Sequence, residues 1–451
     1  MVKKYCFILC VCFIFLRGVA GAAVTVGNFN ELQAAVQNSN NADIKVTADV
    51  LQFNANLFAP ANSVRFNFES APPSGKTLFS GGGLYSGFSF QNKSAVSFEN
   101  MSFSQMSSQV RGAAFSLTNS SASFKGETGF YSNESQDMGG AFEIDSSSIV
   151  FLGAVEITSN SAKYSGGGFI ASDNSTIKFG GGVRISANSS LNGGAFTSDA
   201  ATVIFDAAAS QSVFEKNTSS FDGGAFYASK SDIFFNGEIL FKENSSGQYG
   251  GAGYFEYSTG VFTNAKFYSN SAGMSGGALY AKNSYIVIKS TSGQKSVFNG
   301  NTANAKPNAL HAQESVIIFQ TQAASSIELY DGLSADENSV LVYEGEGTFE
   351  LYGDMSKNYG DLTIAALNGG SFNINAGGVL NAKTLTNAAG SKIDAALNGQ
   401  ADIIAARRLN NNGVLSVDLG DKIKVENDVA LNGAVEIYAD LSDGDFRKAA
   451  Y

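Results

Sequence analysis

The chain has 451 residues and a formal net charge of −11, and only 15% of its residues are charged. Its three cysteines, Cys6, Cys10 and Cys12, all lie near the N-terminus, so the remaining chain can form neither a disulfide framework nor a cysteine metal site. The acidic balance and the lack of a basic stripe argue against nucleic acid or an anionic membrane as a partner.

Residues 1–22 have the pattern of a secretion signal. Lys3 and Lys4 are followed by an apolar stretch over residues 5–16, which is too short for a comfortable membrane span, and then by Ala20-Gly21-Ala22, a small-x-small cleavage site. We therefore expect an exported protein without a lipid anchor, either secreted or held at the cell surface or outer membrane. Loss of the leader would bring the net charge to −14, because it removes Lys3, Lys4 and Arg17.

Residues 23–79 carry no repeat, and we interpret them as an N-terminal cap with the first coils. Asn28 is a predicted helix N-cap with Glu31 three residues later, and the next apolar residues fall on one helical face. Residues 44–47 then alternate as a strand. A short amphipathic helix of this kind can cover the open end of a solenoid and block end-to-end strand pairing.

Residues 80–320 repeat two linked motifs. The fullest copy has Phe-x-x-Asn at Phe214–Asn217 and Gly-Gly-Ala-Phe at Gly223–Phe226. The asparagine recurs at Asn133, Asn160, Asn188, Asn217, Asn244, Asn270 and Asn301. The first glycine of the second motif recurs at Gly81, Gly112, Gly139, Gly166, Gly193, Gly223, Gly250 and Gly276, in steps of 26 to 31 residues. A near-constant period of this size indicates one structural unit stacked on itself.

The composition of each repeat identifies the unit. Short β-branched and aromatic runs alternate with Gly, Ser and Asn, which is typical of strands and turns and excludes helical repeats. The period is too short for a propeller blade. We therefore predict an all-β fold, a right-handed single-stranded parallel β-helix with a short N-terminal capping helix.

Stacking alone accounts for the repeated residues. One predicted buried ladder contains Phe115, Phe142, Phe169, Phe196, Phe226, Leu279 and Leu310, and another contains Phe124, Phe151, Phe179, Phe205, Phe235, Phe262, Ile288 and Phe319. The asparagines are expected to stack amide on amide, and the glycines to provide positive φ or close backbone approach. We interpret these Asn and Gly residues as structural elements, and we expect no catalytic residue, metal site or cofactor.

The two motifs in register resemble the signature of the polymorphic outer membrane proteins, a family of autotransporter adhesins. The resemblance covers about half of the chain, with Phe where the family often has Ile, Leu or Val. It implies a surface-displayed passenger that adheres to host or neighbouring cells.

Residues 321–451 change register, with Ala-Leu-Asn-Gly turns beginning at Ala366, Ala396 and Ala430, and we predict a continuation of the β-helix with shorter coils. No region up to Tyr451 has the pattern of a translocating barrel. The resemblance therefore covers the passenger only, and we expect association with the outer membrane through a further segment or a separate anchor.

One predicted surface feature stands apart from the structural ladders. In the second strand of each repeat, the residues of opposite parity to the buried Phe ladder include Val150, Ile204, Phe234, Val261, Val287 and Ile318. They should point outward and form an apolar stripe, which usually marks an interface. Partner binding, pairing of protomers and coverage by a loop all remain open.

These observations are compatible with three functions. We predict a non-catalytic adhesin that binds a host or bacterial cell-surface protein or glycan; the alternatives are a structural surface or matrix protein that self-associates, and a polysaccharide-active β-helix enzyme. Enzyme chemistry would need clustered carboxylates, whereas the charged residues here are scattered. The single histidine, His311, is at a position that holds Tyr280, Thr197 and Glu143 in other repeats, and we interpret that position as solvent-facing.

Overall fold

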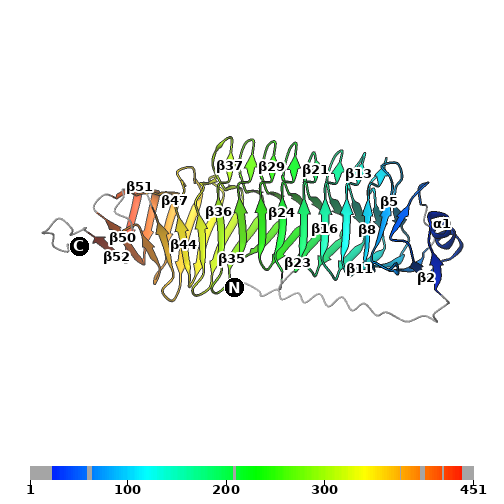
Figure 1. The fold of residues 1–451 in the computed structure, drawn as a ribbon. Coiled ribbons are helices and arrows are strands. Elements are labelled where there is room, and N and C mark those ends of the chain that lie inside the picture. Colours follow the sequence, from blue (N-terminus) through cyan, green and yellow to red (C-terminus); the bar gives the residue numbers. More distant parts are fainter. Residues whose placement is uncertain are drawn as a thin grey trace.

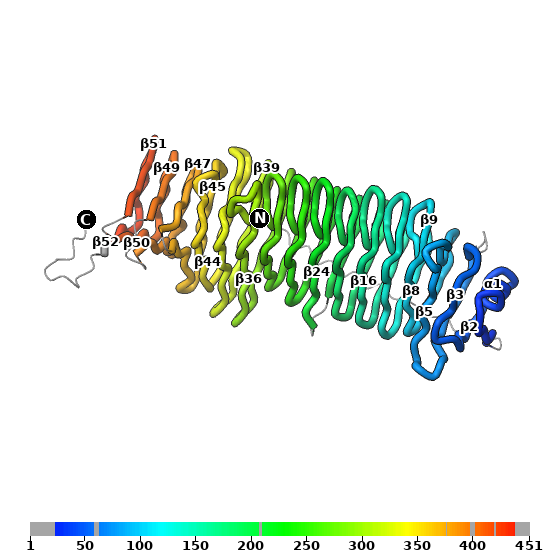
Figure 2. The backbone as a smooth tube through the Cα atoms, turned by 45° about the horizontal axis from the view of Figure 1, so that its top comes forward, coloured from blue at the N-terminus to red at the C-terminus, as the bar shows by residue number. Residues whose placement is uncertain are grey.

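The chain forms an elongated parallel β-solenoid of about 13 turns with one short helix near its N-terminus (Figure 1). The computed structural model describes residues 23–57, 63–206, 210–375, 377–396, 402–418 and 421–438. The predicted solenoid class is confirmed, whereas the predicted leader at residues 1–22 lies outside the described residues. Successive coils stack like the turns of a spring (Figure 2), so each strand pairs with its equivalents in the coils before and after it.

Four sheets run along the solenoid, and a regular coil visits them in the order A, B, D, C. Sheet A has 17 strands. They are β1 (Val24–Val26), β2 (Asn41–Val46), β4 (Arg65–Ser70), β7 (Ala95–Glu99), β11 (Ser121–Lys125), β15 (Ser148–Phe151), β19 (Thr176–Phe179), β23 (Thr202–Asp206), β27 (Asp232–Asn236), β31 (Thr259–Thr263), β35 (Tyr285–Ser290), β40 (Val316–Thr321), β43 (Val340–Gly345), β45 (Asp361–Ala366), β47 (Val379–Asn387), β49 (Ile403–Asn411) and β51 (Lys422–Leu431).

Sheet B has 16 strands and follows sheet A in each coil. They are β3 (Val50–Gln52), β5 (Thr77–Ser80), β8 (Met101–Ser104), β12 (Thr128–Tyr131), β16 (Val155–Thr158), β20 (Val183–Ser186), β24 (Ser212–Glu215), β28 (Ile239–Lys242), β32 (Ala265–Tyr268), β36 (Lys295–Asn299), β41 (Ser326–Leu329), β44 (Thr348–Leu351), β46 (Ser371–Ile374), β48 (Lys392–Asp394), β50 (Val414–Asp418) and β52 (Ala434–Tyr438).

Sheets C and D complete the regular coils, and the two-residue strands of sheet D lie in loops that project along one edge of the solenoid (Figure 1). Sheet C contains β6 (Phe88–Phe90), β10 (Phe115–Thr118), β14 (Phe142–Asp145), β18 (Phe169–Ser172), β22 (Phe196–Asp199), β26 (Phe226–Ser229), β30 (Gly253–Glu256), β34 (Leu279–Lys282), β39 (Leu310–Gln313) and β42 (Leu333–Ala335). Sheet D contains β9 (Ser107–Ser108), β13 (Glu134–Ser135), β17 (Ser161–Ala162), β21 (Ser189–Ser190), β25 (Thr218–Ser219), β29 (Ser245–Ser246), β33 (Ser271–Ala272), β37 (Thr302–Ala303) and β38 (Lys306–Pro307).

The N-terminal end of the core is covered by α1 (Phe29–Asn38), as predicted. The side chain of Asn28 accepts a 3.1 Å hydrogen bond from the Glu31 amide, and Glu31 Oε2 in turn accepts one of 2.7 Å from the Gly27 amide. The first bond satisfies a backbone donor that the first helical turn leaves free, and the second fixes the backbone just before the N-cap. Phe29 and Leu32 are buried on the inner face of the helix, which shields the first coil from water.

The core is built from ladders of equivalent side chains, because parallel strands in register place like residues about 4.8 Å apart. Phe142 and Phe169 stack in sheet C with ring centroids 4.8 Å apart, and Phe179 and Phe205 stack at the same distance in sheet A. The sheet C ladder is interrupted at Gly253, where a Cβ atom would lie 2.0 Å from the Phe226 ring. Phe255, two residues later, occupies the column held by Ala228 and Ala281 and fills the space.

The two glycines of each Gly-Gly-Ala motif are needed for different reasons. Gly223 has φ +65°, a left-handed conformation that side chains rarely adopt. A Cβ atom on Gly224 would lie 2.0 Å from the carbonyl oxygen of Gly251 in the next coil. The first glycine therefore forms the turn and the second allows the coils to approach, which explains why the pair recurs.

The coils change after β42, because only sheets A and B continue. Register-equivalent residues along sheet A, namely Leu341, Leu362, Leu385, Leu409 and Val429, follow one another at 20 to 24 residues. The strands of sheet A lengthen along the solenoid, from four residues in β19 to six in β40 and β43 and nine in β47 and β49. The coil becomes shorter in sequence because the sheet D loop and the sheet C strand are absent.

Candidate functional site

The six residues of the predicted apolar stripe all lie on the outward face of sheet A, where each is half-buried. They occupy one column of the sheet, since strand pairing joins Ile204 to Phe234, Phe234 to Val261, Val261 to Val287 and Val287 to Ile318. Val150 belongs to the same column but is separated from Ile204 by Lys178, whose ammonium group lies 2.9 Å from the Asp206 carboxylate.

The column extends beyond the predicted residues at its C-terminal side. Val342 in β43 pairs with Ile318 and is also half-buried, so apolar side chains occupy the column in six successive coils from Ile204 to Val342. Sequence reasoning missed Val342 because it lies beyond the last regular repeat. In β43, Leu341 and Tyr343 are buried while Val340 and Val342 are half-buried on the outward face, but all four residues are apolar, so their polarity did not distinguish the two faces.

The borders of the column differ in polarity. On one side the next outward column contains Asp206, Asn236, Thr263, Lys289, Gln320 and Glu344. On the other side it contains Thr202, Asp232 and Thr259, followed by Tyr285, Val316 and Val340. The outward face of sheet A thus carries an apolar strip, two columns wide toward its C-terminal side, beside a polar margin. An apolar centre with a polar rim is the usual composition of a binding surface.

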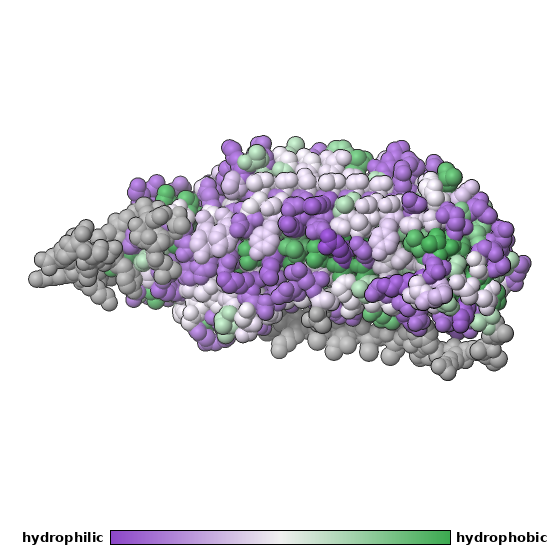
Figure 3. Space-filling model, viewed as in Figure 1, coloured by the Kyte–Doolittle hydropathy of each residue, from purple (hydrophilic) through white to green (hydrophobic). Residues whose placement is uncertain are grey.

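The rest of the surface is mixed. Figure 3 shows one face of the molecule, on which hydrophobic side chains gather in short patches among polar ones. Exposed aromatic side chains occur on several coils. Phe221 and Tyr359 are two of them, Tyr257 and Tyr285 lie on neighbouring coils, and Tyr330 and Tyr352 stack on each other with ring centroids 4.4 Å apart. A single exposed aromatic such as Phe221 needs no explanation, whereas a column repeated in register does.

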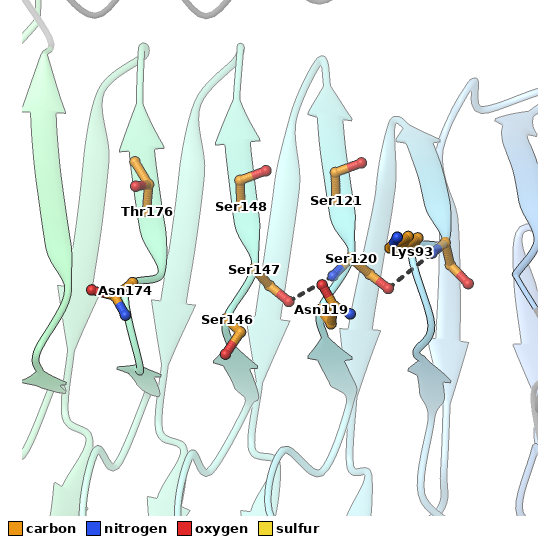
Figure 4. Close-up of a pocket in the computed structure, with 10 residues that line it drawn as sticks. Lys93, Asn119, Ser120, Ser121, Ser146, Ser147, Ser148, Asn174 and Thr176 are labelled. Carbon is orange, nitrogen blue, oxygen red and sulfur yellow. Dashed lines mark hydrogen bonds between the residues drawn. The ribbon is translucent and has the colours of Figure 1, made fainter.

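A serine ladder that the sequence reasoning missed follows the corner where sheet C passes into sheet A. Ser120 Oγ accepts a 3.0 Å hydrogen bond from the Ser94 amide, and Ser147 Oγ accepts one of the same length from the Ser120 amide (Figure 4). The pattern continues through Ser175, Ser231, Ser258, Ser284, Ser315 and Ser339, with Ala201 as one exception. Its signal was the recurrence of serine directly before the sheet A strands from β7 to β43, with the exception of β23, hidden by the abundance of serine elsewhere.

Two hollows lie along this corner. One has a volume of about 410 Å³ and is lined by Lys93, Ser94, Asn119, Ser120, Ser121, Ser146, Ser147, Ser148, Asn174 and Thr176 (Figure 4). The other has a volume of about 530 Å³ and is lined by Tyr257, Ser258, Thr259, Asn283, Ser284, Tyr285, Glu314 and Val316. Both are open grooves on the surface, and the second adjoins the apolar strip through Tyr285 and Val316.

The predicted asparagine ladder is buried and fully bonded. Asn217 Nδ2 donates to the Ile185 carbonyl at 2.9 Å and to Asn244 Oδ1 at 3.0 Å, while its Oδ1 accepts from the amide and Nδ2 of Asn188. The same contacts repeat through Asn133, Asn160, Asn188, Asn244, Asn270 and Asn301. With every donor and acceptor used inside the core, these residues hold the turns together, and no ligand reaches them.

The interpretation of the His311 position as solvent-facing is wrong. Glu143, Thr197 and Tyr280 in the equivalent column are at most 6% exposed, because the glycine turns after sheet D fold over the outer face of sheet C. A Cβ atom on Gly193, for example, would lie 2.6 Å from Thr197 Oγ1. His311 is half-buried, stacks on Tyr280 at 4.8 Å and places Nδ1 2.7 Å from Ser334 Oγ; burial lowers the pKa of its ring.

The same column contains a short stack of tyrosines. The rings of Tyr227 and Tyr254 are 5.1 Å apart and nearly parallel, as are those of Tyr254 and Tyr280 at 5.2 Å. Tyr227 donates a hydrogen bond to Glu256, which also pairs with Lys282 at 2.7 Å. Burial, together with the charge of Glu256, raises the pKa of the Tyr227 hydroxyl above its ordinary range. These ring faces are occupied by one another, so the stack supports the coil and is closed to a ligand.

The described residues contain no group of three or more His, Cys, Asp or Glu side chains placed to hold a metal ion. In the same part of the chain, no helix is both long and apolar enough to cross a membrane. Comparisons with protein-family models, with curated proteins and with solved structures found no match.

Proposed function

We propose that the protein is an exported, surface-displayed β-solenoid that acts as a non-catalytic adhesin. The observation that carries this proposal is the apolar column on the outward face of sheet A, which repeats in six successive coils from Ile204 to Val342 with each side chain half-buried. Exposed apolar surface is costly in water and is retained mainly where a partner covers it. The predicted leader supports export, and the repeat motifs support the resemblance to adhesin passengers.

A self-associating structural protein is the second candidate, and the same column favours it. The apolar side chains of the column follow one another at the spacing of the coils. A second copy of the chain carries them at the same interval, so two solenoids can pair side by side through this column. A polysaccharide-active enzyme is the third. Glycosidic chemistry uses a pair of carboxyl groups, whereas the two hollows are lined by a single carboxylate, Glu314.

One experiment separates the first two candidates. Phe234→Ser and Ile318→Ser would be combined, and binding to cells and self-association by analytical ultracentrifugation would be measured. Asn236→Ser with Gln320→Ser is the matched control, since these residues lie on the same strands, β27 and β40, in the polar margin. An adhesin loses cell binding in the apolar variant alone. Loss of self-association without loss of cell binding would favour the structural protein, and no change in either would overturn both.

A further inference from the structure

The second hollow lies where three successive turns present side chains in the same way. Tyr257, Asn283 and Glu314 each occupy the turn between a sheet C strand and a sheet A strand, with φ of +50°, +49° and +50°. The coils are also bonded at this position, because the Tyr257 amide donates to the Lys282 carbonyl and the Asn283 amide to the Gln313 carbonyl. The three side chains therefore project in parallel, one per coil, about 4.8 Å apart.

Two tyrosines in this hollow expose their rings. Tyr257 is 58% exposed, and Tyr285, at the start of the next sheet A strand, is 44% exposed. Neither ring stacks on another described aromatic ring, unlike the closed stack of Tyr227, Tyr254 and Tyr280. Their faces are consequently open to a ligand.

Some polar groups of the second hollow are hydrogen-bonded within the protein, and others are left for a ligand. Ser258 Oγ and Ser284 Oγ donate to backbone carbonyls and accept from backbone amides of the preceding coil, so they form a rigid floor. The side-chain amide of Asn283 and the carboxylate of Glu314 also line the hollow, and neither makes a hydrogen bond to the described residues. Two aromatic faces thus lie beside an amide and a carboxylate that have hydrogen-bonding capacity to spare.

The first hollow lies on the same corner, nearer the N-terminus, and repeats the arrangement with hydroxyl and amide groups. Figure 4 shows Ser121, Ser148 and Thr176 in a row, one per coil, beside Asn119, Ser146 and Asn174 from the preceding turns. A ligand that spans several coils along the axis meets equivalent polar groups at a constant interval in either hollow. Such a corner fits a linear polymer better than a compact molecule.

We propose that the corner between sheets C and A binds a linear, neutral oligosaccharide that runs along the solenoid axis. The negative face of an aromatic ring attracts the weakly positive C–H groups of a sugar ring, and amide and carboxylate groups bond its hydroxyls. The coil spacing of about 4.8 Å is close to the length of one pyranose unit, so each coil can contact one sugar. Lys93 and Glu314 are the charged side chains among the described lining residues, one in each hollow, which favours a neutral chain over a polyanion.

This assignment rests on the proposed function, because it makes the oligosaccharide a ligand of the adhesin. The hollow meets the apolar strip at Tyr285 and Val316 but does not include the column of Phe234. The purified protein would be screened against immobilised linear hexasaccharides, with cellohexaose and chitohexaose as neutral probes and a hyaluronan hexasaccharide as the acidic one. Calorimetry would then give the affinity for the strongest binder. We expect a neutral probe to bind best.

The test variant combines Tyr257→Asn with Tyr285→Thr. Both new residues already occur at the equivalent positions in other coils, as Asn283 and as Thr259, so the fold should be retained. We expect at least a tenfold loss of affinity, with the thermal unfolding midpoint unchanged. Tyr257→Phe should retain binding, because the ring face is preserved.

The apolar-column variant Phe234→Ser separates this proposal from the proposed function. Binding of a neutral hexasaccharide that is lost in the tyrosine variant and kept in Phe234→Ser supports the oligosaccharide site. If no neutral probe binds, if the acidic probe binds best, or if the tyrosine variant binds as well as the original chain, the assignment is overturned. Loss of cell binding in Phe234→Ser would still support the adhesin in each of those cases.

Discussion

Asn301 Nδ2 donates a 2.7 Å hydrogen bond to Oδ2 of Asp331, so the asparagine ladder ends on a carboxylate. The same carboxylate accepts from the backbone amides of Asn301 and Gly300, both at 2.8 Å. Asp331 is only 5% exposed, and burial outweighs these hydrogen bonds, so the pKa of its carboxyl group is raised. The ladder therefore ends, where sheets C and D also end, on a group that titrates.

This relationship predicts a pH dependence of stability. Below the unfolded pKa of about 3.9 the Asp331 carboxyl is protonated in both states and contributes nothing. As the pH rises from there through the raised pKa of the folded state, the unfolded chain ionises first, so the free energy of unfolding falls, and it levels off once the folded state has also ionised. Asp331→Asn removes this titration. Urea unfolding from pH 4 to pH 7 should show the original chain losing stability relative to the variant, and parallel curves for the two proteins would refute the assignment.

The interior of the ladder should be more sensitive to substitution. Asn217→Ala removes Oδ1, the acceptor of the backbone amide of Asn188 and one acceptor of its side-chain amide, and also removes a donor to the Ile185 carbonyl, all in the core. Each unsatisfied buried group costs about 1–3 kcal/mol, so we expect a loss of about 3 kcal/mol or more in the free energy of unfolding. Asn236→Ala, on the outward face of β27, is the control and should change stability by less than about 0.5 kcal/mol. Equal effects of the two substitutions would contradict the ladder.

Two adjacent phenylalanines in β27 test which face is buried. Phe235 is fully buried, with neighbouring rings 5.1 Å and 4.9 Å away in the coils on either side, so Phe235→Ala should cost about 3–5 kcal/mol. Phe234 is half-buried on the outer face, and Phe234→Ala should cost much less. The comparison is made by urea unfolding followed by circular dichroism. A larger loss for Phe234→Ala would mean that its side chain is covered.

The second glycine of the repeat should not tolerate a side chain. Gly224→Ala would place a Cβ atom 2.0 Å from the Gly251 carbonyl oxygen, and the backbone of two coils would have to separate. Gly293→Ala is the matched control, because the added Cβ atom has no neighbour within 4 Å and only the φ of +74° opposes it. We expect Gly293→Ala to lower the free energy of unfolding by about 1 kcal/mol and Gly224→Ala by several times that amount. Similar thermal midpoints for the two variants would show that the coils are not tightly apposed there.

Much of the fold could be predicted from the sequence because the repeat carries its own geometry. The period fixed which residues are equivalent, and the alternation within each strand separated Phe235 from Phe234 and placed the apolar stripe outward. Alternation cannot indicate what folds over an outward face. The column of Tyr280 and His311 also points away from the core, yet the glycine turns after sheet D cover it, and only the arrangement of the coils in space reveals this.

The site at the corner between sheets C and A could not be predicted from the sequence. Tyr257 and Tyr285 belong to no repeated motif, and their importance comes from lying beside Asn283 and Glu314. Three of these four pairs are 26 residues or more apart along the chain. The serine ladder beneath them was regular in sequence but indistinguishable from the many other serines. Local pattern identifies ladders of unusual residues more readily than ladders of common ones.

The most direct test of the adhesin proposal is protease shaving of intact cells, with the released peptides identified by mass spectrometry. Display at the surface predicts that trypsin releases peptides from the repeat region, for example after Lys230 and Lys242, without cell lysis and together with loss of cell binding. Recovery of these peptides only after the outer membrane has been opened would place the protein inside the envelope and contradict the account.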